Sequence, residues 1–214
     1  LPESVPDSRL ATLQNPSRIT MLLRFPFRLA LASLNPRSNI FRALVVNPGS
    51  GVALDERRIY ARNLEVPSGG GVGTARAIAR AYGVFANGGK ELGLRPATLQ
   101  ELAAPALPPA RGFYDEGLLG DIRFSLGFMK PGPLWQFGTQ ASFGSPGAGG
   151  SLGFADPVSG IGYGYVTNRI GTALAGDPRD IALRDALSAA LQALPSARIR
   201  TRRAEARQPE SAGV

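Results

Sequence analysis

The sequence predicts an α+β fold in which helices come first, an antiparallel sheet follows, and one helix ends the folded part of the chain. Apolar residues recur at helical spacing from Ala75 to Ala86. Beyond Gly120 the period changes to short alternating runs with turns between them. The helical period returns between Asp177 and Leu194. Strands joined by short turns pair antiparallel, and we expect the last helix to cover their sheet.

The amino-acid composition fits one ordinary domain and excludes several kinds of catalytic site. The 214 residues are 43% hydrophobic and 19% charged, and the 27 glycines and 18 prolines predict short elements with many turns. The chain contains no cysteine and no histidine. Disulfides, thiol nucleophiles, the usual zinc sites and every histidine-based triad are therefore excluded, and we expect no cofactor.

The net charge of +8 could indicate an anionic partner. The arginines are scattered, however, except for a cluster in residues 195–214 that has neither apolar periodicity nor stacking aromatics. We therefore expect residues 1–194 to form the folded part and residues 195–214 to be a basic, disordered tail. The same observations argue against nucleic acid as a partner.

Residues 1–66 leave room only for short helices, because prolines recur throughout this segment. Its most apolar stretch runs from Ile19 to Leu34 and is interrupted by Arg24, Pro26 and Arg28. The stretch is too short and too interrupted to cross a bilayer, so we expect no membrane span. We expect a buried helical or irregular segment here instead.

Each later element has local signals at its ends. Thr74 is a good N-cap for the helix that follows, and Asn87-Gly88-Gly89 should end it. A second short helix should begin at Pro96 and end before Pro105. The predicted extended segments are Ile122–Phe128, Trp135–Phe143, Ser151–Ala155 and Ile161–Asn168, the last two joined by a hairpin turn at Asp156–Gly160. Asp177 should cap the final helix, with Pro178 in its first position.

Two motif-like runs carry no chemistry by themselves. Gly149–Gly153 matches G-x-S-x-G, but that nucleophile elbow needs a histidine base, which is absent. The glycine-rich stretches at 69–73 and 147–150 lack the residues of a phosphate loop. The acidic residues Asp115, Asp121 and Asp156 show no spacing that pairs two carboxylates, and we expect them in solvated turns.

A block from Phe143 to Arg169 remains, made largely of glycine, serine, proline and alanine before its second strand. A strand edge of such small residues lets the backbone or the acyl group of a ligand approach closely. A glycine-rich hairpin without a ligand explains the same residues equally well.

This block resembles a sequence in the serine hydrolases related to class C β-lactamases and family VIII esterases, which are penicillin-binding-protein-like. These proteins carry F-G-H-x-G-x-G-G-S-x-G-F-A-D-P and then a strand that ends in N-R. A second matching segment has Pro67, Gly70, Gly71, Thr74, Ala75, Ala79 and Arg80, followed by Asn87-Gly88-Gly89. The resemblance covers roughly residues 1–194. It implies part of a β-lactamase/transpeptidase-like fold: the later sheet strands, the C-terminal helix and part of the helical subdomain.

The resemblance also implies a mechanism with three motifs. S-x-x-K supplies a nucleophilic serine and a lysine that helps to deprotonate it, and Y-x-N supplies a second proton-transfer group. The third motif, K-T-G or H-x-G, lines the sheet edge beside the acyl group, and its counterpart here is Ser145-Pro146-Gly147. The resemblance further implies that Ala148, followed by Gly149, gives a backbone N–H to the oxyanion hole. Neither S-x-x-K nor Y-x-N occurs in the 214 residues.

Two functional hypotheses follow. The chain is the C-terminal part of a β-lactamase-like serine esterase that acts on a small ester or lactam, and it is inactive alone because the nucleophile is absent. In this case its partner is a missing N-terminal half, and its sheet should have an unpaired edge. Alternatively, the chain is a non-catalytic binding or regulatory module on the same scaffold. The cellular location is open, because any targeting segment would lie upstream. A cytoplasmic location is favoured.

Overall fold

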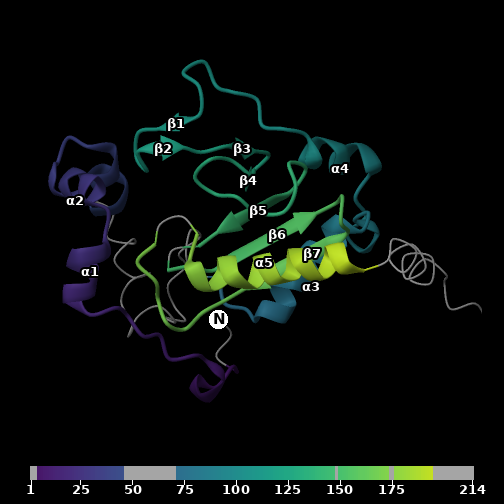
Figure 1. Cartoon of the computed structure of the whole chain (residues 1–214), viewed down its shortest axis with the longest axis horizontal. Coiled ribbons are helices and arrows are strands. Elements are labelled where there is room, and N and C mark those ends of the chain that lie inside the picture. The colour runs from purple at the N-terminus through teal and green to yellow at the C-terminus, as the bar shows by residue number, and fades with distance from the viewer. Residues whose placement is uncertain (1–3, 46–70, 148, 174–175, 195–214) are drawn as a thin grey trace, which may run out of the picture. The chain divides into compact units, whose positions relative to one another are not determined.

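A computed structural model describes residues 4–45, 71–147, 149–173 and 176–194 and confirms the α+β class (Figure 1). The chain forms two compact units, Leu1–Asp177 and Pro178–Val214. The first unit holds short helices and an antiparallel sheet, and the second holds helix α5 (Pro178–Ala193), which follows the sheet in the chain. The predicted covering of the sheet by α5 stays a prediction, as does the boundary at residue 194. The predicted tail, 195–214, lies outside the described residues.

The main sheet has five antiparallel strands in the order β3-β4-β5-β6-β7. Their bounds are Phe124–Ser125, Phe128–Met129, Phe143–Pro146, Leu152–Asp156 and Ile161–Tyr165. A separate two-stranded ribbon pairs β1 (Tyr114–Asp115) with β2 (Gly120–Asp121). Strands β6 and β7 pair over their full lengths. Among the described residues β3 and β7 are the edge strands of this sheet.

The N-terminal segment forms short helices, as the prolines predict. After the 3-10 turn η1 (Asp7–Arg9) come α1 (Arg18–Arg24), α2 (Phe27–Leu34) and the π-helical turn η2 (Phe41–Val45). The hydroxyl of Ser17 caps α1 by accepting a hydrogen bond from the Thr20 N–H at 3.1 Å. Pro26 separates the two α-helices.

The expectation that this apolar stretch is buried was wrong. Within α2 only Leu29 is buried, whereas large apolar side chains of both helices are exposed. The helices are too short, and too sharply separated at Pro26, for one continuous apolar face to lie against the sheet. Of the described helices, none has the length and apolar character that crossing a membrane requires.

The next two helices begin and end where the sequence predicts. Helix α3 (Ala75–Ala86) starts at Thr74, whose hydroxyl accepts a hydrogen bond from the Ala77 N–H at 3.2 Å. It ends before Gly88, whose φ of 101° ordinary residues avoid. The 3-10 turn η4 (Lys90–Leu92) then leads to α4 (Pro96–Ala103), which has proline in its first turn.

Helix α3 lies on one face of β6 and β7 at three glycines, which we call the glycine face: Gly153, Gly162 and Gly164. A Cβ added at Gly162 would collide with the backbone of Gly83 and Ala79 in α3. A Cβ added at Gly164 would lie 2.5 Å from the carbonyl oxygen of Ala75. Because alternate strand residues share a face, these glycines let the helix backbone approach the sheet backbone directly.

Two apolar clusters flank the sheet. On the side of α3, Phe143 and Ala155 are fully buried with Ala86 and Leu102. Phe128 packs edge-on against Phe143, with ring centroids 5.3 Å apart. The other cluster consists of Phe137, Leu152 and Phe154, with Trp135 and Tyr163 against it. Strand β6 contributes to both clusters and β5 contributes Phe143 to the first, so β6 holds the core of the first unit together.

Two of the predicted strands were wrong in part. The run from Ile122 to Phe128 is a hairpin rather than one strand, because Leu126 (φ 50°) and Gly127 (φ 82°) form a tight turn between β3 and β4. The run from Trp135 to Phe143 is mostly irregular and extends as a strand only from Phe143. Strands β6 and β7 and the hairpin between them confirm the prediction, with β7 ending earlier, at Tyr165.

The glycine face can be tested with two glycines that lie against each other. Gly162→Ala should lower the free energy of unfolding by about 1–3 kcal/mol, because the new methyl group has to displace α3. Gly83→Ala is the matched control: its Cβ meets nothing within 4 Å. The control should gain up to about 1 kcal/mol from helix propensity. Urea unfolding of both variants measures the difference, and equal effects would contradict the close approach.

Candidate functional site

The predicted third motif begins at the end of β5. Pairing between β4 and β5 stops at Met129 and Gly144, so Ser145 and Pro146 pair only with β6 among the described residues. Phe143 is fully buried, whereas Ser145 is exposed on the same face of the strand. The hydroxyl of Ser145 makes only a long hydrogen bond, 3.4 Å, to the carbonyl oxygen of Pro146. This hydroxyl is therefore accessible to a ligand.

A tight glycine turn follows and links β5 to β6. The Gly147 N–H donates to the Ser151 carbonyl at 2.7 Å, and the Gly150 N–H donates to the Gly147 carbonyl at 3.2 Å. Gly149 and Gly150 have φ values of 87° and 109°, which side chains strain. Ser145, Pro146, Gly147 and Gly149 thus lie together on one strand end and turn. Ala148, the predicted oxyanion donor, lies outside the described residues.

Three residues further along the chain lie against this turn. The Gly171 N–H donates to the carbonyl of Gly149 at 2.8 Å, and a Cβ on Gly149 would lie 2.8 Å from the Ile170 side chain. A Cβ on Gly150 would lie 2.5 Å from a carboxylate oxygen of Asp177, which is buried. The sequence analysis assigned Asp177 only to a helix cap and did not single out Ile170. The run of glycines signals a close approach but does not say which residues approach.

Ser145 has no general base beside it. Within the described part of the chain, none of its hydrogen bonds reaches a lysine, a tyrosine or a carboxylate. A serine hydroxyl without an adjacent base is a weak nucleophile. Ser151, the serine of the G-x-S-x-G run, comes directly before strand β6 rather than between a strand and a helix. This arrangement is consistent with treating that match as coincidental.

Lys130 has a perturbed pKa, yet its contacts lie in the core and not at the end of β5. It is buried, its Nζ donates to the Leu102 carbonyl near the end of α4, and it lies 5.3 Å from the Phe143 ring centroid. Burial lowers the pKa of Lys130 to about 8. The amine therefore binds a helix C-terminus. Burial also raises the pKa of Tyr82, which keeps that phenol protonated. Nothing in the sequence pattern marked either residue.

The expectation that Asp156 lies in a solvated turn was wrong. Asp156 is buried rather than solvated, and one carboxylate oxygen accepts from the Thr139 hydroxyl at 2.9 Å and from the Val158 N–H at 3.0 Å. It therefore ties the β6–β7 turn to the segment before β5. Asp115 is the half-buried last residue of β1, and it accepts hydrogen bonds from the N–H groups of Gly117 and Leu118 in the turn that follows. The described residues contain no group of three acidic, cysteine or histidine side chains that could hold a metal ion.

Comparisons with known proteins identify the family. The family model described as Beta-lactamase matches residues 6–188. The esterase/beta-lactamase LipL of Mycobacterium tuberculosis is 36% identical over 108 residues, which are 50% of this chain and 24% of LipL. A crystal structure of a family VIII carboxylesterase aligns with a TM-score of 0.61 and 30% identity, over 87% of this chain and 44% of that one.

The chain belongs to the β-lactamase family, whose members include serine hydrolases of the esterase and penicillin-binding-protein-like kinds. EstA from Arthrobacter nitroguajacolicus Rue61a shares the fold, with a TM-score of 0.63 at 24% identity over 90% of this chain and 48% of EstA. The resemblance to the β-lactamase-related serine hydrolases is thereby confirmed at the level of the family. The chain spans a quarter to a half of the length of these relatives.

The turn can be tested by comparing its glycines. Gly150→Ala should lower the free energy of unfolding by about 1–3 kcal/mol, because it forces a side chain into a strained φ and against Asp177. Gly147→Ala is the control, since its Cβ would lie 3.4 Å from the Ser151 side chain. This control should change stability by no more than about 0.5 kcal/mol. Thermal unfolding compares the two, and a harmless Gly150→Ala would contradict the packing against Asp177.

The buried lysine predicts a pH dependence. In the folded chain Lys130 loses its proton near pH 8, whereas the unfolded chain keeps it until about pH 10.5. Between these values the unfolded state binds more protons, so this group makes stability rise with pH, by at most about 1.4 kcal/mol per pH unit. Urea unfolding measures the free energy of unfolding of the wild type and of Lys130→Met. The wild-type value minus the variant value should rise between about pH 8 and pH 10.5. A flat difference would show that Lys130 titrates normally.

Proposed function

We propose that this chain supplies the acyl-binding wall of a serine esterase for small ester or lactam substrates, and that its 214 residues do not hydrolyse esters alone. The observation that carries the proposal is the exposed Ser145 at the open end of β5, beside the glycine turn. The family as a whole acts on small molecules, and the proposal assigns that substrate class to this chain.

The geometry at the end of β5 supports a place for an acyl group. Since β4 pairs with β5 only at Met129 and Gly144, the backbone of Ser145 and Pro146 has no partner in β4 and can receive a planar ester or amide on that side. Gly147 and Gly149 add no side chains there. By resemblance, the Ala148 N–H would donate one oxyanion hydrogen bond. One such donor stabilises a tetrahedral intermediate only when a nucleophile has formed it.

The inactivity of the isolated chain rests on what the remaining residues can do. The chain has only two lysines, Lys90 and Lys130, and neither follows a serine by three positions. Lys130 is already bound to the Leu102 carbonyl. Removing the nucleophile from a cooperating catalytic set removes nearly all of the rate enhancement.

One feature favours the alternative, a non-catalytic binding or regulatory module. Ser145 stands where the family motif has lysine or histidine. Its hydroxyl neither carries a charge nor exchanges a proton near neutral pH. A site that has lost its protonatable group can still hold an ester by shape and hydrogen bonding.

Inactivity is tested directly with the purified chain. Hydrolysis of p-nitrophenyl butyrate should show no saturation and should equal that of Ser145→Ala, and a fluorophosphonate probe should label no serine. Saturable turnover that co-purifies with the folded chain through successive columns, together with a labelled serine, would refute inactivity.

The coding DNA upstream of Leu1 separates the esterase from the binding module. The esterase proposal expects codons there for S-x-x-K and Y-x-N. The encoded segment, co-expressed with this chain, should then restore saturable hydrolysis. Under these conditions Ser145→Ala should lower kcat/KM by about 2- to 13-fold, the effect of one neutral hydrogen bond. Upstream reading frames without either motif would favour the module.

A further inference from the structure

The surface of α1 and α2 has an unusual distribution of apolar side chains. In α2, Phe27, Leu31 and Leu34 share one helical face, and they are 74%, 53% and 76% exposed. In α1, Ile19 and Leu23 share a face and are 71% and 77% exposed. Such stripes normally face a protein core. We call these five residues the α1–α2 surface; exposed apolar patches of this kind mark interaction sites.

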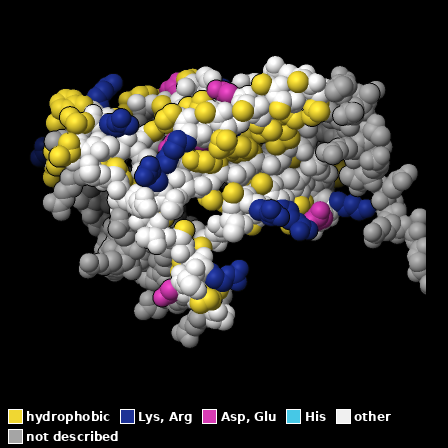
Figure 2. All heavy atoms as spheres, turned by 60° about the horizontal axis from the view of Figure 1, so that its bottom comes forward, with side chains coloured by type: hydrophobic (Ala, Val, Ile, Leu, Met, Phe, Trp, Pro, Cys, Tyr) yellow, Lys and Arg dark blue, Asp and Glu magenta, His cyan; other side chains and the backbone are white. Residues whose placement is uncertain are grey.

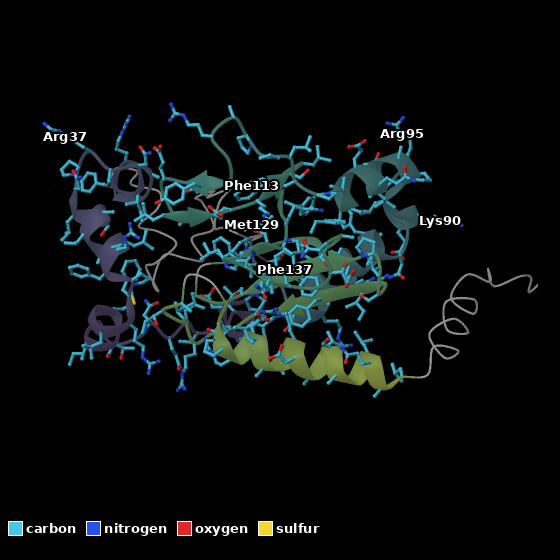
Figure 3. The ribbon with its side chains drawn as sticks, turned by 45° about the horizontal axis from the view of Figure 1, so that its top comes forward. Arg37, Lys90, Arg95, Phe113, Met129 and Phe137 are labelled. Atoms are coloured by element: carbon cyan, nitrogen blue, oxygen red, sulfur yellow. The ribbon has the colours of Figure 1, made fainter. Side chains whose placement is uncertain are left out.

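The segment that holds both helices carries charge of one sign along its sequence. Residues 8–45 contain no aspartate or glutamate. They contain Arg9, Arg18, Arg24, Arg28, Arg37 and Arg42. Of these, Arg24, Arg28, Arg37 and Arg42 are exposed. Yellow apolar and blue basic side chains gather at the left end of Figure 2, and Arg37 points outward at the same end of Figure 3.

Within the described part of the chain, the carboxylate of Glu116 forms a hydrogen bond with this segment. Glu116, in the turn between β1 and β2, accepts a hydrogen bond from the Asn39 amide at 2.9 Å. Its other oxygen faces Arg111 at 3.8 Å. This contact attaches the helical segment to the ribbon, and it does not neutralise the arginines of α1 and α2.

We propose that the α1–α2 surface binds an anionic lipid surface, with both helices lying in the headgroup layer. Apolar side chains flanked by arginines are the signature of interfacial helices: the apolar groups enter the acyl boundary and the guanidinium groups contact phosphates. The helices have seven and eight residues and cannot span a bilayer. The arrangement is therefore peripheral.

The charge argues against two other occupants. A second copy of the chain bound through the same surface would bring arginines against arginines across the symmetry axis. Nucleic acid would attract the arginines but offers no apolar layer for Phe27, Leu31 and Leu34. A lipid surface offers both phosphates for the arginines and an apolar layer for the stripes. The proposal does not depend on catalysis, and its readout is binding.

The test uses the full chain with sedimenting vesicles. Phosphatidylcholine vesicles that contain about one third phosphatidylglycerol should bind the chain at least about tenfold more tightly than pure phosphatidylcholine vesicles. Raising the salt to about 0.5 M should weaken binding, because the charges are exposed. Absence of binding to the anionic vesicles would overturn the proposal.

Two variants and two controls assign the binding to this surface. Phe27→Ser with Leu31→Ser, and Arg24→Gln with Arg28→Gln and Arg37→Gln, should each weaken vesicle binding at least about tenfold. The controls Leu107→Ser and Arg95→Gln alter similarly exposed residues elsewhere and should change binding less than about twofold. Figure 3 shows Arg95 at the opposite end from Arg37. Circular dichroism checks that all variants fold.

Three results would contradict the proposal. If both variants bind vesicles as the wild type does, then another basic part of the chain, such as residues 195–214, is responsible. If the chain instead forms a dimer that the Phe27/Leu31 variant abolishes, without binding vesicles, the surface binds a second copy. If the arginine variant weakens binding to duplex DNA while the apolar variant leaves both DNA and vesicle binding unchanged, the surface is a nucleic-acid contact.

Discussion

The close approach of α3 to strands β6 and β7 is the contact on which the rest of the first unit depends. It is possible because Gly162 and Gly164 place no Cβ between the helix backbone and the sheet. With α3 at this distance, the Tyr82 and Phe85 side chains meet Phe128 and Phe143 in the core beside the sheet. Strand β5 then lies against β6 in a fixed register. The position of the candidate site follows from that register.

The strand end and glycine turn combine an accessible hydroxyl with a rigid backbone. Hydrogen bonds from Gly147, Gly150 and Gly171 hold the turn, and Asp177 lies against it. A site held in this way can position a substrate without reorganising. Among the described residues, no lysine, tyrosine or carboxylate is hydrogen-bonded to the Ser145 hydroxyl. The proposed acyl-binding wall without its own nucleophile fits a chain that covers 44% of a family VIII carboxylesterase.

Elements with signals in their own residues could be predicted, and those that depend on distant contacts could not. The Thr74 cap and the Asn87-Gly88-Gly89 stop mark α3 locally. The hairpin at Leu126 was missed because an alternating pattern reads the same on both sides of a tight turn. The roles of Lys130, Asp156 and Asp177 arise from partners many residues away. The family motif located the strand end, since its residues are contiguous, but gave no information on the exposure of α1 and α2.

The glycine face also limits how this protein can change by mutation. Glycine codons have the form GGN, so any single-base change that replaces the residue introduces a side chain with at least a Cβ. At Gly162 even the smallest such side chain meets the helix backbone, which cannot rotate away as a side chain could. No conservative replacement exists there. Related chains should therefore keep glycine at this position, and with it the spacing between helix and sheet.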